Sequence, residues 1–156
     1  MATNESSGPA NVDISQINVG QGEGYDKKCI FCKVANNEMG TELLHVDEEV
    51  SCFRDIKPGA PHHYLVVPTR HVGNCKSLSK EHVSLETKKQ PMFLFFIYRF
   101  GFHWPPFCSV SHLHLHVLAP ASQMGFMSRL FYRPNSYWFV TADQLIQQLN
   151  SKGETN

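Results

Sequence analysis

Three histidines stand at every second position between Ser111 and Pro120, and this pattern constrains the fold more than any other part of the chain. The stretch reads Ser-His-Leu-His-Leu-His-Val-Leu-Ala-Pro, so His112, His114 and His116 alternate with aliphatic residues. Strict alternation predicts a β-strand with an aliphatic face that packs on the core and a second face of imidazoles. Neighbouring imidazoles on that face would lie roughly 6.5–7 Å apart.

The number of histidines on one face indicates a functional site. A single histidine in a strand is usually an ordinary surface or hydrogen-bonded residue. An imidazole is costly to bury without partners, so packing alone does not explain three of them. Imidazole is also the side chain best suited to proton transfer near neutral pH and to metal ligation.

Composition narrows the class of protein. The 156 residues predict one domain with a real core, and the formal net charge of zero gives no reason to expect binding to nucleic acid or to an anionic membrane. The five cysteines are an odd number, and the first residues lack the charged and apolar regions of a secretory signal. We therefore expect a reducing compartment, namely the cytoplasm with the nucleus as a second location.

Local patterns predict an α+β fold with a mostly antiparallel sheet and flanking helices. We expect a disordered tail at 1–24, a folded domain at 25–150 and a disordered end at 151–156. The expected elements are a helix at 29–35, a hairpin of strands at 41–46 and 50–54, a strand at 62–68, the histidine strand at 111–120, and helices beginning at Ser79 and Thr141. A double proline predicts a loop at 102–106. Hairpin-connected strands with separate helices are typical of this class.

Two mechanisms fit a strand of histidines. Two imidazoles at alternate positions could hold a zinc ion that keeps one position open for water. Alternatively, one imidazole attacks a phosphoryl group and its neighbours bind the anion, which gains from donors on several sides. Ser109, His63 and Asp55 favour the phosphoryl mechanism, because they could serve a phosphate oxygen, a leaving group and a ribose diol respectively. Ile56 could contact a base.

Cys29 and Cys32 have a spacing found in metal and redox sites. Half of a zinc site requires another half, so this segment alone favours two small residues that pack beneath a helix.

The motif His112-Leu-His114-Leu-His116-Val-Leu118 resembles the His-x-His-x-His-x-x motif of the histidine triad superfamily. Other segments of that family occur in the same order, namely Cys29-Ile-Phe-Cys32-Lys, Phe53-Arg-Asp55-Ile56, Ala60-Pro-His-His63-Tyr-Leu-Val-Val-Pro68 and Arg70-His71. The resemblance covers roughly Tyr25 to Leu85 and Arg99 to Leu149. It implies an antiparallel sheet with helices, a homodimer and an adenosine 5′-monophosphoramidase that acts on purine nucleotides.

The resemblance also implies roles for individual residues. His114 would attack the α-phosphorus and become transiently adenylylated, with His112 and His116 as its orienting and phosphate-binding neighbours. His63 matches a fourth family histidine with a catalytic role. The resemblance implies a nucleotide site formed by Asp55, Ile56, Ser109, His114, Leu115 and His116. This chemistry requires no cofactor.

Some members of the superfamily carry a structural zinc, and the matching positions here are Cys29, Cys32, His63 and His112. Such a zinc would make His112 structural rather than catalytic. One segment departs from the family: Glu86–Tyr98 is short and contains Pro91. This departure leaves one alternative to the phosphoramidase, a nucleotide-binding or scaffold protein without catalysis. A second alternative is a zinc-dependent hydrolase built on the histidine strand.

Overall fold

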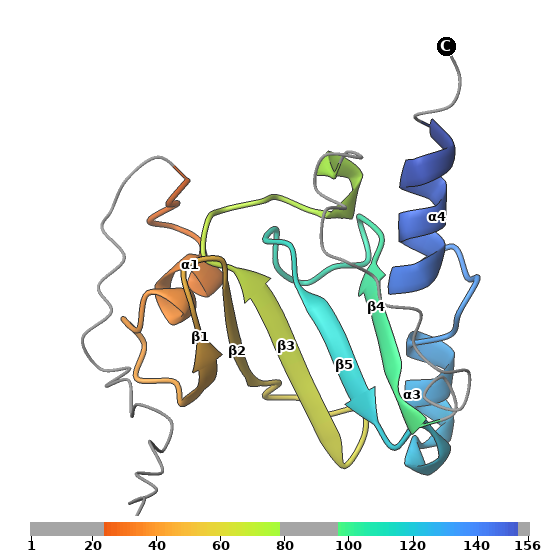
Figure 1. Cartoon of the computed structure of the whole chain (residues 1–156). Helices are drawn as coiled ribbons and strands as arrows, with labels where there is room; N and C mark the ends of the chain where they lie inside the picture. Colours follow the sequence, from red (N-terminus) through yellow and green to blue (C-terminus); the bar gives the residue numbers. More distant parts are fainter. Residues whose placement is uncertain (1–23, 79–96, 153–156) are drawn as a thin grey trace, which may run out of the picture.

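The computed structural model describes residues 24–78 and 97–152, whose six strands form one antiparallel sheet (Figure 1). The strand order is β1-β2-β3-β5-β4-β6. The strands are β1 (Leu43–Val46), β2 (Val50–Arg54), β3 (His62–Pro68), β4 (Arg99–His103), β5 (Leu115–Ala119) and β6 (Phe139–Thr141). Strand β5 lies between β3 and β4, so the histidine segment enters the middle of the sheet. The fold class is the expected α+β.

Helix α1 (Ile30–Ala35) covers the β1–β3 end of the sheet (Figure 1). Its residues Val34 and Ala35 pack against Phe53, Leu65 and Val67 in one buried cluster. Burial of this apolar surface attaches the helix to the sheet, because six residues are too few for an independently stable helix. This attachment places Cys29 and Cys32 at a fixed distance from the strands.

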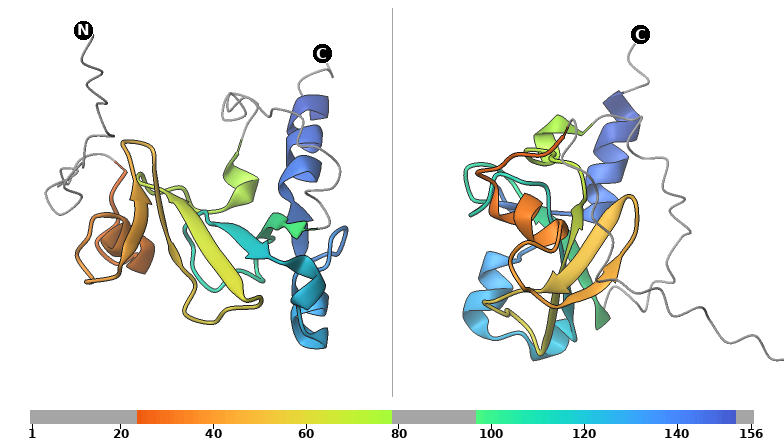
Figure 2. Two further views of the ribbon diagram at one scale, coloured as in Figure 1. Left: turned by 60° about the horizontal axis from the view of Figure 1, so that its bottom comes forward. Right: turned by 90° about the vertical axis from the view of Figure 1, so that its left-hand side faces the viewer.

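Helices α3 (Phe126–Phe131) and α4 (Ala142–Lys152) lie at the opposite end, beside β4 and β6 (Figures 1 and 2). The predicted capping box of α4 is present, since the amide of Gln144 donates to the hydroxyl of Thr141 and the amide of Thr141 donates to the side chain of Gln144. Leu145 and Leu149 pack this helix against Cys75 and Val140. Two short 3-10 helices complete the described elements, at Cys75–Ser77 and Ala121–Gln123.

Gly101 in β4 allows the close approach of β6. A Cβ at this position would lie 2.4 Å from the ring of Phe139 and 2.4 Å from the carbonyl oxygen of Val140. Only a residue without a side chain avoids that overlap. Because Gly101 pairs with His116 on β5, its small size lets Phe139 pack close to the histidine strand.

The structure corrects the bounds of three predicted segments. Strand β5 begins at Leu115 rather than Ser111, because residues 104–114 form an irregular loop that returns the chain from β4. The loop predicted at 102–106 begins after His103, since Phe102 and His103 pair with β6. Helix α4 also extends to Lys152, past the predicted domain end at residue 150.

Several predictions lie wholly or largely outside the described residues. They are the tail at 1–24 except Gly24, the helix beginning at Ser79, the departing segment 86–98 except its last two residues, and the end of the chain after Lys152. Within the described part of the chain, no helix has the length and apolar character needed to cross a membrane.

Candidate active site

The three histidines of the motif are buried, although only His116 lies within β5. The exposed fractions of His112, His114 and His116 are 1%, 7% and 5%, whereas the alternate residues are only half-buried. The sequence predicted the reverse, with the aliphatic side toward the core. A buried imidazole needs hydrogen-bonding partners, and each of the three finds them in a different place.

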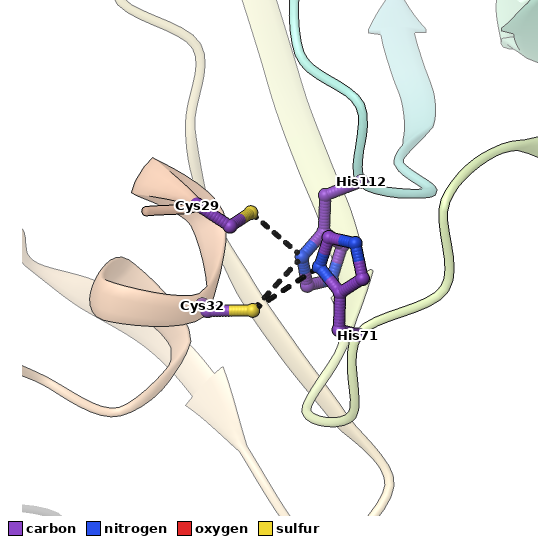
Figure 3. Close-up of side chains that lie close together, drawn as sticks. All are labelled: Cys29, Cys32, His71 and His112. Carbon is purple, nitrogen blue, oxygen red and sulfur yellow. Dashed lines mark hydrogen bonds between the residues drawn. The ribbon is translucent and has the colours of Figure 1, made fainter. Parts of the chain in front are cut away.

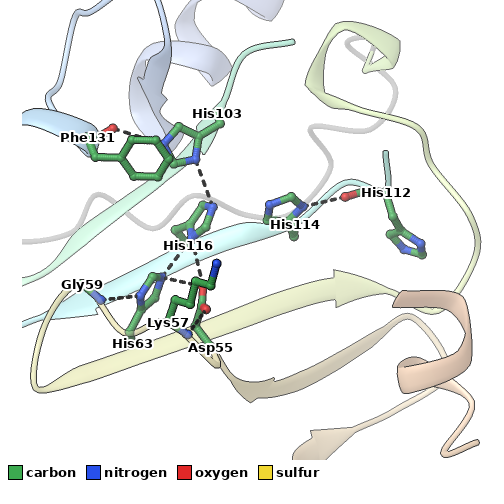
Figure 4. Close-up of polar contacts among 9 residues, drawn as sticks. All are labelled: Asp55, Lys57, Gly59, His63, His103, His112, His114, His116 and Phe131. Carbon is green, nitrogen blue, oxygen red and sulfur yellow. Dashed lines mark hydrogen bonds and ion pairs between the residues drawn. The ribbon is translucent and has the colours of Figure 1, made fainter. Parts of the chain in front are cut away.

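A row of hydrogen-bonded imidazoles crosses the sheet from β3 through β5 to β4 (Figure 4). It begins at the backbone N–H of Gly59, which donates to Nδ1 of His63 over 2.9 Å. Because Nδ1 accepts, a neutral His63 carries its hydrogen on Nε2. That Nε2–H donates to Nδ1 of His116 over 2.9 Å, so His116 also carries its hydrogen on Nε2.

The far end of the row fixes the same direction of donation. The Nε2–H of His116 donates to Nδ1 of His103 over 3.2 Å, and the Nε2–H of His103 donates to the carbonyl oxygen of Phe131 over 3.1 Å. A backbone N–H can only donate and a carbonyl can only accept, so the two ends agree on every tautomer between them. We call His63, His116 and His103 the histidine row.

Burial keeps the histidine row neutral. It lowers the pKa of His103 to about 4 and lowers the pKa of His116 still further. Burial also lowers the pKa of His63, and the carboxylate of Asp55, 3.4 Å from its Nε2, opposes this effect without overcoming it. Three neutral imidazoles are what a one-way chain of hydrogen bonds requires, because each ring must accept at one nitrogen and donate at the other.

His114 has a different arrangement, because one nitrogen of its ring points at the backbone of His112. Its Nδ1 lies 2.7 Å from the carbonyl oxygen of His112, so Nδ1 carries the hydrogen and Nε2 carries the lone pair. Among the described residues, no group hydrogen-bonds to this Nε2. Burial lowers the pKa of His114, and the ring of Phe31 packs edge-on at 5.1 Å. The neutral Nε2 therefore has the lone pair that a nucleophile requires near neutral pH.

The predicted nucleotide residues are only partly brought together. Asp55 reaches His63 and lies 4.0 Å from Nδ1 of His116, while its other carboxylate oxygen accepts the backbone N–H of Lys57. Leu115 opens β5 opposite Val66. Ile56 is 92% exposed on the loop after β2, and Ser109 is exposed on the loop after β4. Among the described residues, neither one makes a hydrogen bond or ring contact with His114.

His112 belongs to a second cluster, formed with Cys29, Cys32 and His71 (Figure 3). Its Nδ1 lies 3.3 Å from Sγ of Cys29 and 3.5 Å from Sγ of Cys32, and Nδ1 of His71 lies 3.3 Å from Sγ of Cys32. All four possible ligand atoms lie within 4.8 Å of one another. We call this group the cysteine–histidine cluster. The predicted set named His63, but the structure places His71 there and commits His63 to the histidine row.

The cysteine–histidine cluster fits a zinc ion. Two sulfurs and two imidazole nitrogens are a common structural ligand set, and four protein ligands fill a tetrahedral site. The tautomer of His112 also fits, since its Nε2–H donates to the carbonyl oxygen of Pro68 over 3.0 Å and leaves a bare Nδ1 toward the sulfurs. Burial raises the pKa of Cys32 to about 11, so the cluster without metal holds a thiol there, and a metal would displace its proton.

A second set of possible ligands, Asp55, His63 and His116, does not fit a metal. Nε2 of His63 is the atom that contacts both Asp55 and His116. This nitrogen carries a hydrogen in the histidine row, because Gly59 already donates to the other nitrogen. A neutral imidazole with a donor at Nδ1 has no lone pair on Nε2 for a metal. The geometry therefore separates the two sets: the set with the sulfurs has free ligand atoms that fit a metal, and the set with Asp55 is engaged in hydrogen bonds.

Sequence reasoning missed two histidines of these clusters. His71 stands in the Arg70-His71 segment, which was noted but given no role. His103 was assigned to a loop, although Arg99 to His103 precede the motif by the length of a hairpin return. A strand there that pairs with β5 would have placed His103 two residues beyond Gly101, which pairs with His116.

The sequence matches a family model described as the scavenger mRNA decapping enzyme C-terminal binding family, over residues 28–92 and 94–132. It is 56% identical to an adenosine 5′-monophosphoramidase HINT3 of Xenopus tropicalis, over 85% of this chain and 94% of the relative. It is 49% identical to the mouse (Mus musculus) protein of the same name, over 80% of this chain and 83% of the relative.

A search of solved structures gives a consistent result. The fold is similar to that of a HIT family hydrolase from Clostridium thermocellum, with a TM-score of 0.52 and 25% sequence identity. The match covers 64% of this chain and 96% of that structure.

Proposed function

We propose a function from one premise, which is that the chain belongs to the histidine triad superfamily. The chain is a hydrolase that acts on phosphorus–nitrogen bonds, an adenosine 5′-monophosphoramidase like the relatives that it matches over most of their length. Its substrates are adenosine phosphoramidates and acyl-adenylates, and its products are AMP and the released amine or acid.

The observation that carries this function is the hydrogen bond from Nδ1 of His114 to the carbonyl oxygen of His112. It fixes the tautomer, so the lone pair on Nε2 is available without prior loss of a proton. In the histidine row, both nitrogens of each imidazole are engaged in hydrogen bonds with protein groups. In His112, one nitrogen faces the sulfurs and the other donates to the carbonyl of Pro68. His114 is the imidazole of the motif that can attack.

The reaction proceeds in two displacements. The Nε2 lone pair of His114 attacks the α-phosphorus, the phosphorus–nitrogen bond breaks, and its electron pair leaves with the amine, which takes up a proton. Water then attacks the phosphorus of the adenylylated His114, and the bond between phosphorus and Nε2 breaks. The water oxygen remains on AMP, its proton returns to the solvent and replaces the one taken up by the amine, and the imidazole returns to its neutral form. The sum consumes one water. Splitting one difficult displacement into two easier ones lowers the barrier.

The histidine row positions the neighbourhood of this nucleophile. Neither His112 nor His116 has an N–H left for a phosphate oxygen, so the phosphate-binding role expected for them passes to other donors, with Ser109 as the side chain that we assign to it. The carboxylate of Asp55 binds the ribose hydroxyls, and Ile56 and Leu115 contact the nucleoside. His63 acts through His116 and Asp55 rather than at the leaving group.

A structural zinc ion completes the proposed protein. Cys29, Cys32, His71 and His112 would hold it, and it would supply a cross-link between helix α1, the segment after β3 and the segment before β5. His112 then supports catalysis through its backbone carbonyl, which orients His114, and not through its ring. We also propose a homodimer, in a reducing compartment of the cytoplasm and nucleus, where the thiols stay free to bind metal.

The test is to trap the intermediate. Protein is mixed in excess with an adenosine phosphoramidate, quenched within one turnover and digested, and mass spectrometry locates the AMP group. We expect it on His114, with no trapping and no turnover in His114→Ala. His45→Ala, which removes an exposed histidine of β1, is the matched control and should behave as the parent protein. Equal turnover by His114→Ala and the parent would contradict the proposal.

A further inference from the structure

An apolar pocket of about 280 Å³ opens beside the histidine row and has no part in the mechanism above. Its lining is Phe107, Met127, Leu130, Phe131 and Trp138. These residues come from the loop after β4, from helix α3 and from the turn before β6. The only polar group among these side chains, the indole N–H of Trp138, is already satisfied by the carbonyl oxygen of Leu130. The pocket therefore accepts neutral apolar groups and disfavours a phosphate or a ribose.

Phe131 is a wall shared by the pocket and the histidine row. Its ring lies 4.3 Å from the ring of His103, and its carbonyl oxygen accepts the last hydrogen bond of the row. Phe107 links the pocket to the other end of the site, because it stands on the loop that carries Ser109 and continues to His112. The ring centroids of His114 and His116 lie 4.9 Å apart, those of His116 and His103 lie 4.9 Å apart, and Phe131 follows, so a series of ring contacts leads from His114 to the wall of the pocket.

The order of strands decides which end of a substrate this pocket would receive. Asp55, which the proposed function assigns to the ribose, follows β2 and reaches the row from the β3 side of β5. The pocket lies on the β4 and β6 side, where His103 and Phe131 end the row. In a phosphoramidate the phosphorus stands between nucleoside and amine. With phosphorus at His114 and the nucleoside toward β3, the amine substituent extends toward the pocket.

The size of the pocket suits one ring. A cavity of roughly 150 Å³ lined by apolar side chains already binds benzene, so 280 Å³ accepts a phenyl group with its linker. We propose that the apolar pocket is the subsite for the amine leaving group, and that the preferred substrates are adenosine phosphoramidates of amines with a neutral aromatic or branched side chain. This inference rests on the proposed function, and it names the substrate class of the same site.

The experiment compares three substrates: the unsubstituted adenosine 5′-phosphoramidate, its N-phenethyl derivative, and the derivative of γ-aminobutyrate, which ends in a carboxylate. In the parent protein, kcat/KM for the phenethyl substrate should exceed that for either of the others by about tenfold or more, the scale of discrimination by an apolar pocket. Leu130→Lys places a cation in the pocket and should reduce the phenethyl-to-γ-aminobutyrate ratio by about tenfold or more, because it repels the ring and attracts the carboxylate.

Two variants serve as controls. Leu130→Met keeps the pocket apolar and should preserve the ratio. Tyr137→Lys adds the same charge at a side chain that is 92% exposed beside Trp138 but does not line the pocket, and it should also preserve the ratio. If Leu130→Lys lowers the unfolding temperature, Met127→Lys, at a side chain that is 72% exposed, provides a second introduction of charge.

The outcomes separate the subsite from the proposed function. Turnover of the unsubstituted substrate without any preference for the phenethyl derivative, or an equal ratio in Leu130→Lys and Tyr137→Lys, overturns the subsite and leaves the phosphoramidase standing. Failure of the parent protein to cleave any of the three overturns the proposed function, and the subsite with it.

Discussion

Two clusters of histidines meet at the segment from His112 to His116, and they hold their imidazoles in opposite ways. In the cysteine–histidine cluster, Nδ1 of His112 and of His71 points at sulfur, and the Nε2–H of His112 is held by a backbone carbonyl. In the histidine row, nitrogen meets nitrogen, and backbone groups hold only the two ends. In the first cluster, a bound metal would displace the protons of the thiols. In the second, the hydrogen bonds fix the position of every N–H.

The comparison shows what assigns a role to a histidine. His112, His114 and His116 share one residue type, one spacing and nearly equal burial. They differ in the partners of their ring nitrogens: sulfurs and the carbonyl of Pro68 for His112, the carbonyl of His112 for His114, and two imidazoles for His116. The tautomer follows from the partner, and it is the basis of the roles that we propose: metal ligand for His112, nucleophile for His114 and positioning residue for His116. His114, between the two clusters, depends on both through the backbone on either side of it.

Removal of metal should break the first cluster alone and have the largest effect on stability. When the free zinc concentration is about a thousand times the dissociation constant of the site, binding stabilises the folded state by about 4 kcal/mol. Chelation, or Cys32→Ser, should lower the free energy of unfolding by about that amount, measured by denaturant titration with the zinc content determined in parallel. His63→Gln, in the other cluster, should keep one zinc per chain. Equal zinc loss in both variants would refute the separation of the two clusters.

Acid should break the second cluster. The pKa of His103 is about 4 when folded and near its ordinary value when unfolded, so the unfolded chain binds more protons between roughly pH 6.5 and 4. The contribution of His103 to the free energy of unfolding is therefore complete above about pH 6.5 and declines as the pH falls to 4. The decline is at most about 1.4 kcal/mol per pH unit for each histidine with such a lowered pKa. Denaturant titration of metal-stripped protein measures this slope. If the free energy of unfolding of His103→Asn depended on pH as that of the parent does, the assignment of this slope to His103 would be wrong.

How far the sequence predicted this site differs between the two clusters. The motif from His112 to His116, the cysteine pair and Asp55 were found from spacing and resemblance, because those residues are close in sequence or lie in recognisable segments. The predicted fourth member of the cysteine–histidine cluster was wrong, because His63 and His71 both belong to the segment at and after β3, and only the register of β3 against β5 distinguishes them. His63 pairs with Leu118, whereas His71 lies past the end of β3 beside His112.

The burial pattern and the strand boundary could not be predicted for a related reason. Alternation indicated two faces, but hydrophobicity alone placed the aliphatic face in the core. The three imidazoles are the more buried set because each has partners that satisfy it: Cys29 and Pro68 for His112, the carbonyl of His112 for His114, and His63 and His103 for His116. The hairpin at 41–54, the strand at 62–68 and the capped helix were predicted well because their signals are local.

His103 sharpens the comparison, because it tests whether direction within the row matters beyond packing. His103→Leu removes the acceptor for the buried Nε2–H of His116, and an unsatisfied buried donor costs about 1–3 kcal/mol. His103→Asn supplies an amide oxygen and should restore the larger part of that loss. Nitrogen NMR of His116 should show a single Nε2–H tautomer in the parent and in His103→Asn, and a mixture in His103→Leu. An unchanged tautomer in His103→Leu would show that the far end of the row has no influence.

The smallest expected effect lies outside both clusters and calibrates the others. Thr141→Ala removes the hydroxyl that accepts the amide of Gln144, which should cost about 1 kcal/mol of stability. Helix α4 touches β4 and β6 but contributes no side chain to either cluster, so zinc content, the tautomer of His116 and kcat should not change. Denaturant titration, metal analysis, nitrogen NMR and turnover measurements on one protein preparation cover all four. If this variant reproduced the losses of His103→Leu or Cys32→Ser, those losses would report general destabilisation. If it does not, they report the partners that each imidazole has lost.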